Sequence, residues 1–117
     1  GETVAAYLAC AEFMQSVQAA VFLLNKRYMP YYKWTDRAMK TLPKLGADLS
    51  AKLRILTSNA AFHVKVDVIE DISAALIERA KAEGLTRSDA DFLLPHAMEI
   101  QSRIEDPELA RMHVMAE

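Results

Sequence analysis

The chain has 117 residues, of which 52% are hydrophobic and 26% charged, with one cysteine and a formal net charge of -2. These values suit one domain of ordinary size and exclude disordered, collagen-like and disulfide-stapled chains. Because a lone thiol, Cys10, cannot form an intrachain disulfide, we expect a cytoplasmic protein. The chain begins with Gly1 rather than Met, so we expect residues 1–117 to form a single helical domain, the C-terminal fragment of a longer protein.

The first predicted elements are three helices. Apolar residues recur at steps of three and four, which predicts a long helix over Glu2–Tyr28. The predicted buried stripe of this helix consists of Cys10, Phe13, Met14, Val17, Ala20, Val21, Leu24 and Tyr28. Pro30 disfavours helical backbone before it and separates this helix from a short one over Tyr32–Thr41. A third helix is predicted to begin at Asp48, as its N-cap, and to end at Ser58.

Further helices are predicted in the second half of the chain. One covers Ala61–Glu83, with Gly84 as its C-terminal cap. The alternation within Val64–Val68 is also typical of a strand, but it continues into a helical stripe. Thr86 resembles the start of a fifth helix that runs to about Glu105, and Pro107 suits the first turn of a sixth. The predicted fold class is all-α: a bundle of five to six helices with a long first helix.

The longest strongly apolar run is Ala19–Leu24. It is far shorter than the roughly 20 residues that cross a bilayer. We therefore expect no membrane partner.

The charge is distributed unevenly along the chain. Residues 25–54 contain eight basic and two acidic residues, a net charge of +6, whereas the residues before them carry -2 and those after them -6. A local positive potential attracts anions even when the net charge of a protein is near zero. The same segment contains the aromatic cluster Tyr28, Tyr31, Tyr32 and Trp34.

The candidate binding residues are cations and aromatic side chains of this segment: Lys26, Arg27, Tyr28, Tyr31, Lys33, Trp34 and Arg37. Aromatic faces stack on rings and Lys or Arg neutralises phosphates, so the pattern predicts an anionic or ring-bearing ligand such as a nucleotide. An alternative is that the aromatic side chains pack where two helices meet and the cations are solvated. The acidic remainder of the chain opposes long polyanions, and we do not expect nucleic acid as a partner.

Catalytic and metal-binding patterns are missing from the sequence. The three glycines are too sparse for a phosphate-binding loop, and the three histidines are too far apart for a zinc site. His96 and Glu99 lie one turn apart and are interpreted as a hydrogen-bonding pair. Cys10 lies in the apolar stripe, which favours a packing role over a nucleophilic one. We expect no catalytic residue, no metal and no cofactor in this chain.

Two stretches carry a resemblance to a known family. They are Phe22–Trp34 (FLLNKRYMPYYKW), followed by Arg37-Ala38 and Leu42-Pro43, and Asp91–Ala97 with Ile104–Leu109. Together they resemble a bacterial helical domain of unknown function that lies C-terminal to a nucleotidyltransferase domain. The resemblance implies a non-catalytic accessory bundle that helps to form a substrate cleft, with the upstream nucleotidyltransferase domain of the same protein as its partner. It also implies that any magnesium (Mg) is bound by aspartates of that upstream domain.

A different class of function is also compatible with the sequence. The chain can be an interaction or dimerisation module that has no small-molecule ligand. In a homodimer, Tyr31 and Trp34 would then be interface anchors, a role that suits large aromatic side chains.

Overall fold

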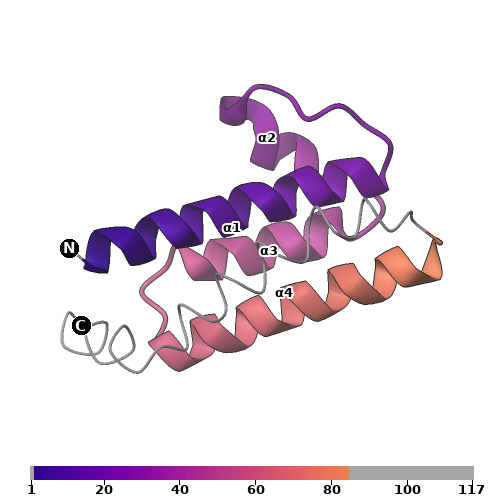
Figure 1. Cartoon of the computed structure of the whole chain (residues 1–117). Coiled ribbons are helices and arrows are strands. Elements are labelled where there is room, and N and C mark those ends of the chain that lie inside the picture. Colours follow the sequence, from indigo (N-terminus) through magenta and orange to yellow (C-terminus); the bar gives the residue numbers. More distant parts are fainter. Residues whose placement is uncertain (1, 85–117) are drawn as a thin grey trace.

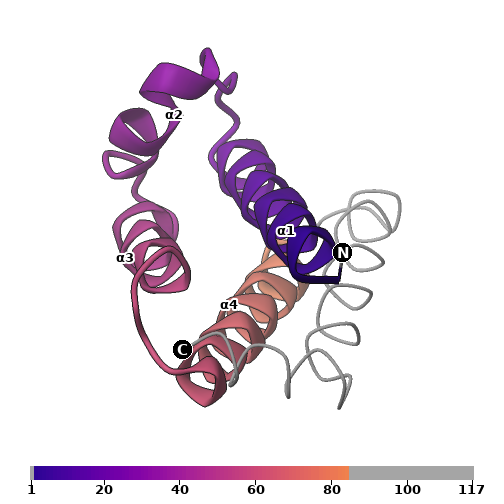
Figure 2. The same cartoon turned by 90° about the vertical axis from the view of Figure 1, so that its left-hand side faces the viewer.

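The computed structural model describes residues 2–84, which form four α-helices (Figure 1). They are α1 (Glu2–Leu24), α2 (Tyr32–Met39), α3 (Gly46–Leu56) and α4 (Phe62–Ala82). Helices α1, α3 and α4 pack against one another, and α2 lies at one edge against α1 and α3 (Figure 2). The all-α fold class is confirmed for these residues, whereas the helices predicted after Thr86 lie outside the described residues.

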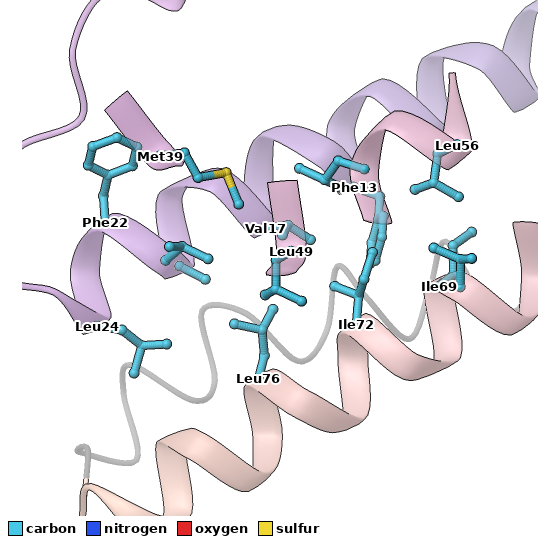
Figure 3. Packing of buried hydrophobic residues seen from close by; sticks show 14 of the residues in the cluster. Phe13, Val17, Phe22, Leu24, Met39, Leu49, Leu56, Ile69, Ile72 and Leu76 are labelled. Carbon is cyan, nitrogen blue, oxygen red and sulfur yellow. The ribbon is translucent and has the colours of Figure 1, made fainter. Parts of the chain in front are cut away.

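The hydrophobic core fills the space between the helices (Figure 3). The buried apolar residues of α1, α3 and α4 recur at helical spacing, as predicted: Phe13, Val17, Ala20, Val21, Leu24, Leu49, Leu53, Leu56, Val68, Ile69, Ile72 and Leu76. Met39 of α2 is buried as well, without having been predicted, whereas Val64, at the start of the predicted stripe of α4, is 36% exposed. Cys10 and Met14 are half-buried at the edge of this core. Phe22 is also buried, although it lies outside the predicted stripe.

Helix α1 ends at Leu24, before the predicted end at Tyr28. Lys26 adopts a left-handed backbone conformation with φ 54°. The backbone amides of Lys26 and Arg27 donate to carbonyl oxygens of the preceding turn, at 3.0 Å each. This arrangement is a Schellman motif with Lys26 in the position that glycine usually occupies. The helix therefore stops at this motif, and its last residue, Leu24, is six positions before Pro30.

Asn25 joins the end of α1 to the connection between α2 and α3. Its side-chain amide donates to the carbonyl oxygens of Val21 at 2.7 Å and Lys44 at 3.0 Å. The Lys44 backbone amide donates in return to Asn25 Oδ1 at 2.9 Å. The Lys44 side chain forms a hydrogen-bonded ion pair with Glu83, which directly follows α4. The hydrogen bond from Lys44 is the main reason why the pKa of Glu83 is lowered. We call the reciprocal bonds between Asn25 and Lys44 the Asn25 clip.

Helix α3 begins earlier than predicted. Its first residue is Gly46, preceded by Leu45 as the N-cap, with φ 66°. Asp48 is therefore not the N-cap. It lies in the first turn, where its negative charge interacts favourably with the partial positive charge at the start of the helix. It also forms an ion pair with Lys52 at 3.3 Å.

The start of α3 is packed tightly against the end of α2. A Cβ atom at Gly46 would lie 2.2 Å from the Met39 carbonyl oxygen and 2.9 Å from Leu42 Cβ. No larger residue fits without movement of the backbone of α2. Glycine at this position is thus a requirement of packing.

Helix α4 matches its prediction closely. It covers Phe62–Ala82, and Val64–Val68 is helical, so the strand alternative is wrong. Gly84 has φ 64°, and its amide donates to the Lys81 carbonyl oxygen at 3.2 Å. The predicted glycine cap is confirmed.

Among the described residues, one helical window is long and apolar enough to cross a membrane: Tyr7–Leu24 of α1. Helices in the cores of globular proteins pass the same test. Within this window Phe13, Val17 and Val21 are almost completely buried against the other helices. The expectation of no membrane partner stays a prediction.

The close approach at Gly46 predicts a large effect of one methyl group. Gly46→Ala should lower the free energy of unfolding by about 3 kcal/mol because the new Cβ overlaps backbone atoms. Gly84→Ala is the matched control: its Cβ would meet nothing within 4 Å, so only the positive φ opposes it, at about 1 kcal/mol. Urea unfolding followed by circular dichroism measures both, and equal losses would contradict the packing argument.

The Asn25 clip also predicts a measurable loss. Asn25→Ala leaves the Lys44 backbone amide and carbonyl without these partners and should cost about 2 kcal/mol. Thr41→Ala removes an exposed side-chain bond to the Ala38 carbonyl oxygen and should cost less than about 0.5 kcal/mol. Hydrogen exchange at the Lys44 amide should quicken in the first variant and not in the second.

Candidate functional site

The seven predicted binding residues are all exposed, and they form two groups. Lys26, Arg27 and Tyr28 follow the end of α1, whereas the other four belong to the start and outer face of α2. The connecting segment runs back along α1 before α2 begins, so the end of α1 and α2 lie at different places in the fold (Figure 1). The sequence predicted one corner, and the structure does not bring all seven residues together.

The group at the end of α1 has a structural explanation. Lys26 and Arg27 follow the carboxyl end of the helix, where cations complement its partial negative charge. Tyr28 is fully exposed, so the prediction that it belongs to the buried stripe of the first helix is wrong. The reason is that the Schellman motif turns the chain before Tyr28 can face the core.

The second group is a compact patch on α2. We call Tyr31, Tyr32, Lys33, Trp34 and Arg37 the α2 patch. Lys33 Nζ and the Arg37 guanidinium carbon each lie 5.9 Å from the centroid of the Trp34 ring. Such distances are within the range of cation–π attraction, about 6 Å. The patch therefore combines two cations with one aromatic ring.

The two tyrosines of the α2 patch are also in contact. The rings of Tyr31 and Tyr32 are tilted by 53° with centroids 4.4 Å apart. A side-chain hydrogen bond with Tyr32 raises the pKa of Tyr31. Tyr31 is 65% exposed and Trp34 is 51% exposed, which contradicts the alternative that these side chains are packed away between two helices.

The outward orientation of the α2 patch follows from the residues on the opposite side of α2. Thr35 and Met39, one turn apart, are almost completely buried. Thr35 Oγ1 donates to the Pro30 carbonyl oxygen at 3.1 Å and is 3.2 Å from that of Tyr31. Because the inward face of the helix is fixed in this way, its period directs Lys33, Trp34 and Arg37 to solvent.

Asp36 is the one acidic residue between positions 25 and 47, and it faces α3. Its Oδ1 accepts a 2.7 Å hydrogen bond from Ser50 Oγ, and its Oδ2 lies 3.3 Å from Lys40 Nζ. Burial raises the pKa of this carboxyl, but the bonds from Ser50 and Lys40 and the charges of Lys40 and Arg54 outweigh burial and lower it. Within residues 2–84, Lys33 and Arg37 form no ion pair with a carboxylate.

Other titratable residues have structural roles. Cys10 is half-buried, and burial raises the pKa of its thiol, with a smaller opposing effect of the Lys65 charge. This environment disfavours the reactive thiolate. No group of three or more metal-ligating side chains occurs in the part of the chain that the structure describes. His96 and Glu99 lie outside that part.

Comparison with known proteins gives one family match. A family model described as "Domain of unknown function (DUF4037)" matches residues 1–35. This part of the chain is similar to a domain of unknown function. The match includes the stretch Phe22–Trp34 and ends before Arg37. No curated protein and no solved structure matches the chain.

Two positions that matter here were not among the predicted site residues. Tyr32 contacts Tyr31 within the α2 patch, and its place in the aromatic cluster was the signal for it. Asn25 fixes the path of the chain into α2. Asparagine near the end of a helical stripe is a known stop signal, but the stripe continuing to Tyr28 concealed it.

The pKa of Asp36 predicts a change in acid sensitivity. This pKa is lower in the folded than in the unfolded chain, so the ionised Asp36 stabilises the fold. Its contribution to the free energy of unfolding is fully present above the ordinary carboxyl pKa and is lost as pH falls through the pKa of the folded state. Asp36→Asn should lose less stability than the wild type between about pH 5 and pH 2. Ser50→Ala should show a smaller change in the same direction. Urea unfolding at stepped pH measures this, and an unchanged acid loss in both variants would contradict it.

Proposed function

We propose that this chain is a non-catalytic accessory domain whose α2 patch contacts an anionic or ring-bearing substrate. The observation that carries the proposal is the exposure of Lys33 and Arg37 beside Trp34, with the neighbouring carboxylate of Asp36 directed to α3. Because Lys33 and Arg37 have no carboxylate partner within residues 2–84, they retain their attraction for a ligand anion. They lie within the segment that carries a net charge of +6.

We propose further that the parent protein is a nucleotidyltransferase and that this domain forms one side of its substrate cleft. The support is the resemblance of the stretches Phe22–Trp34 and Asp91–Ala97 to domains that follow nucleotidyltransferase domains. In such a protein the upstream domain would hold magnesium and perform the transfer. This chain would contribute binding contacts to the substrate, which is a nucleotide or another small anion.

A second candidate function is self-association without a small ligand. It is favoured by the exposure of large apolar side chains in the first half of α1, at Val4, Tyr7 and Leu8. Exposed aromatic side chains at Tyr31 and Trp34 would add anchors to such an interface. This function requires that the sedimentation rate rise with protein concentration.

The proposed function is tested by titration with ATP at low salt. Trp34 is the one tryptophan in the chain, so its fluorescence reports on the α2 patch directly. We expect a saturable change that weakens as salt rises, because exposed charge contacts are screened within about 10 Å at 0.1 M. Arg37→Gln should raise the Kd by about tenfold, as expected for loss of one charge-assisted contact.

The matched control is Lys81→Gln, an exposed lysine on α4, which does not contact α2. This variant should retain the wild-type Kd. If ATP leaves the Trp34 fluorescence unchanged at low salt, and the sedimentation coefficient rises with protein concentration, the binding function is rejected and self-association is supported.

A further inference from the structure

The geometry of Trp34 bears on which part of a ligand the α2 patch recognises. A ring that stacks on a base must offer an open face. The Trp34 ring is instead approached by Lys33 Nζ and by the Arg37 guanidinium, each at 5.9 Å from its centroid. A base that stacked on a face of Trp34 approached by these cations would have to compete with them for the ring.

The same contacts give Trp34 a different use. Lys33 and Arg37 belong to adjacent turns of one short helix, and both cations lie near the same ring. The negative face of an indole attracts cations, so the ring holds two flexible side chains in one region and lowers the entropic cost of using both. Two like charges held near each other favour a ligand that carries several negative charges.

The chemistry of the two cations narrows the ligand class. A guanidinium offers a planar fork of donors that matches two oxygens of a phosphate, and an ammonium acts as a compact point charge. The neighbouring carboxylate of α2, Asp36, is occupied by Ser50 and Lys40. Neither cation of the patch is therefore neutralised by it.

We propose that the α2 patch is a clamp for a polyphosphate group, in which Trp34 positions Lys33 and Arg37 and does not stack on the ligand. This inference rests on the proposed function, in that it names the substrate class for the same site. The polyphosphate can be free or can be the phosphate chain of a nucleotide. In both cases the phosphate oxygens are the recognised atoms.

The test compares three probes by isothermal titration calorimetry at low salt: inorganic tripolyphosphate, ATP and adenosine. We expect the Kd values of tripolyphosphate and ATP to agree within about threefold, and adenosine to bind at least about 30-fold more weakly. Adenosine that binds as tightly as ATP would overturn the clamp while leaving a ring-binding site. An ATP affinity more than tenfold above that of tripolyphosphate would also overturn it, because the base would then contribute most of the difference. No binding of any probe would reject the proposed function itself.

Variants of Trp34 test its positioning role. Trp34→Phe keeps an aromatic face and should retain the tripolyphosphate Kd within about threefold, whereas Trp34→Leu should raise it about fivefold or more. Circular dichroism checks that both variants fold, as expected for a half-exposed residue. Equal Kd values for the Phe and Leu variants would overturn the role of the ring as a holder of cations.

Discussion

The Asn25 clip is the constraint on which the arrangement of the helices depends. The side-chain amide of Asn25 forms hydrogen bonds with the Val21 carbonyl oxygen in the last turn of α1 and with both backbone groups of Lys44, nineteen positions later. The same Lys44 reaches Glu83 at the end of α4. Three segments therefore meet at one point, and the chain between Asn25 and Lys44 forms a closed loop that contains α2. The clip fixes both ends of that loop, which places α2 at the edge of the bundle.

Stability and binding are linked through Asp36. The bond from Ser50, a completely buried residue, holds α2 to α3 and directs the carboxylate away from the outer face of α2. The same bond therefore removes the nearest acid from Lys33 and Arg37. Although the Asp36 side chain is half exposed, its two oxygens are bonded to Ser50 and Lys40, so among the described residues it forms no ion pair with Lys33 or Arg37.

The stretch Phe22–Trp34, which carries the family resemblance and lies within the family match, combines two kinds of residue. Phe22 is buried, and Asn25 and Lys26 end α1. The stretch then supplies Lys33 and Trp34 to the α2 patch. Part of the motif is thus needed to turn the chain, and part is available for a ligand.

The sequence by itself determined the helical class, the buried faces of α1, α3 and α4, and the glycine cap at Gly84, because these depend on local period and backbone preference. It also located the basic and aromatic residues. Only the tertiary structure decided that α1 stops at Leu24, since the stop requires the left-handed Lys26 and a partner at Lys44. The same holds for the division of the predicted site into two groups, because the path between α1 and α2 is set by contacts between residues far apart in the chain.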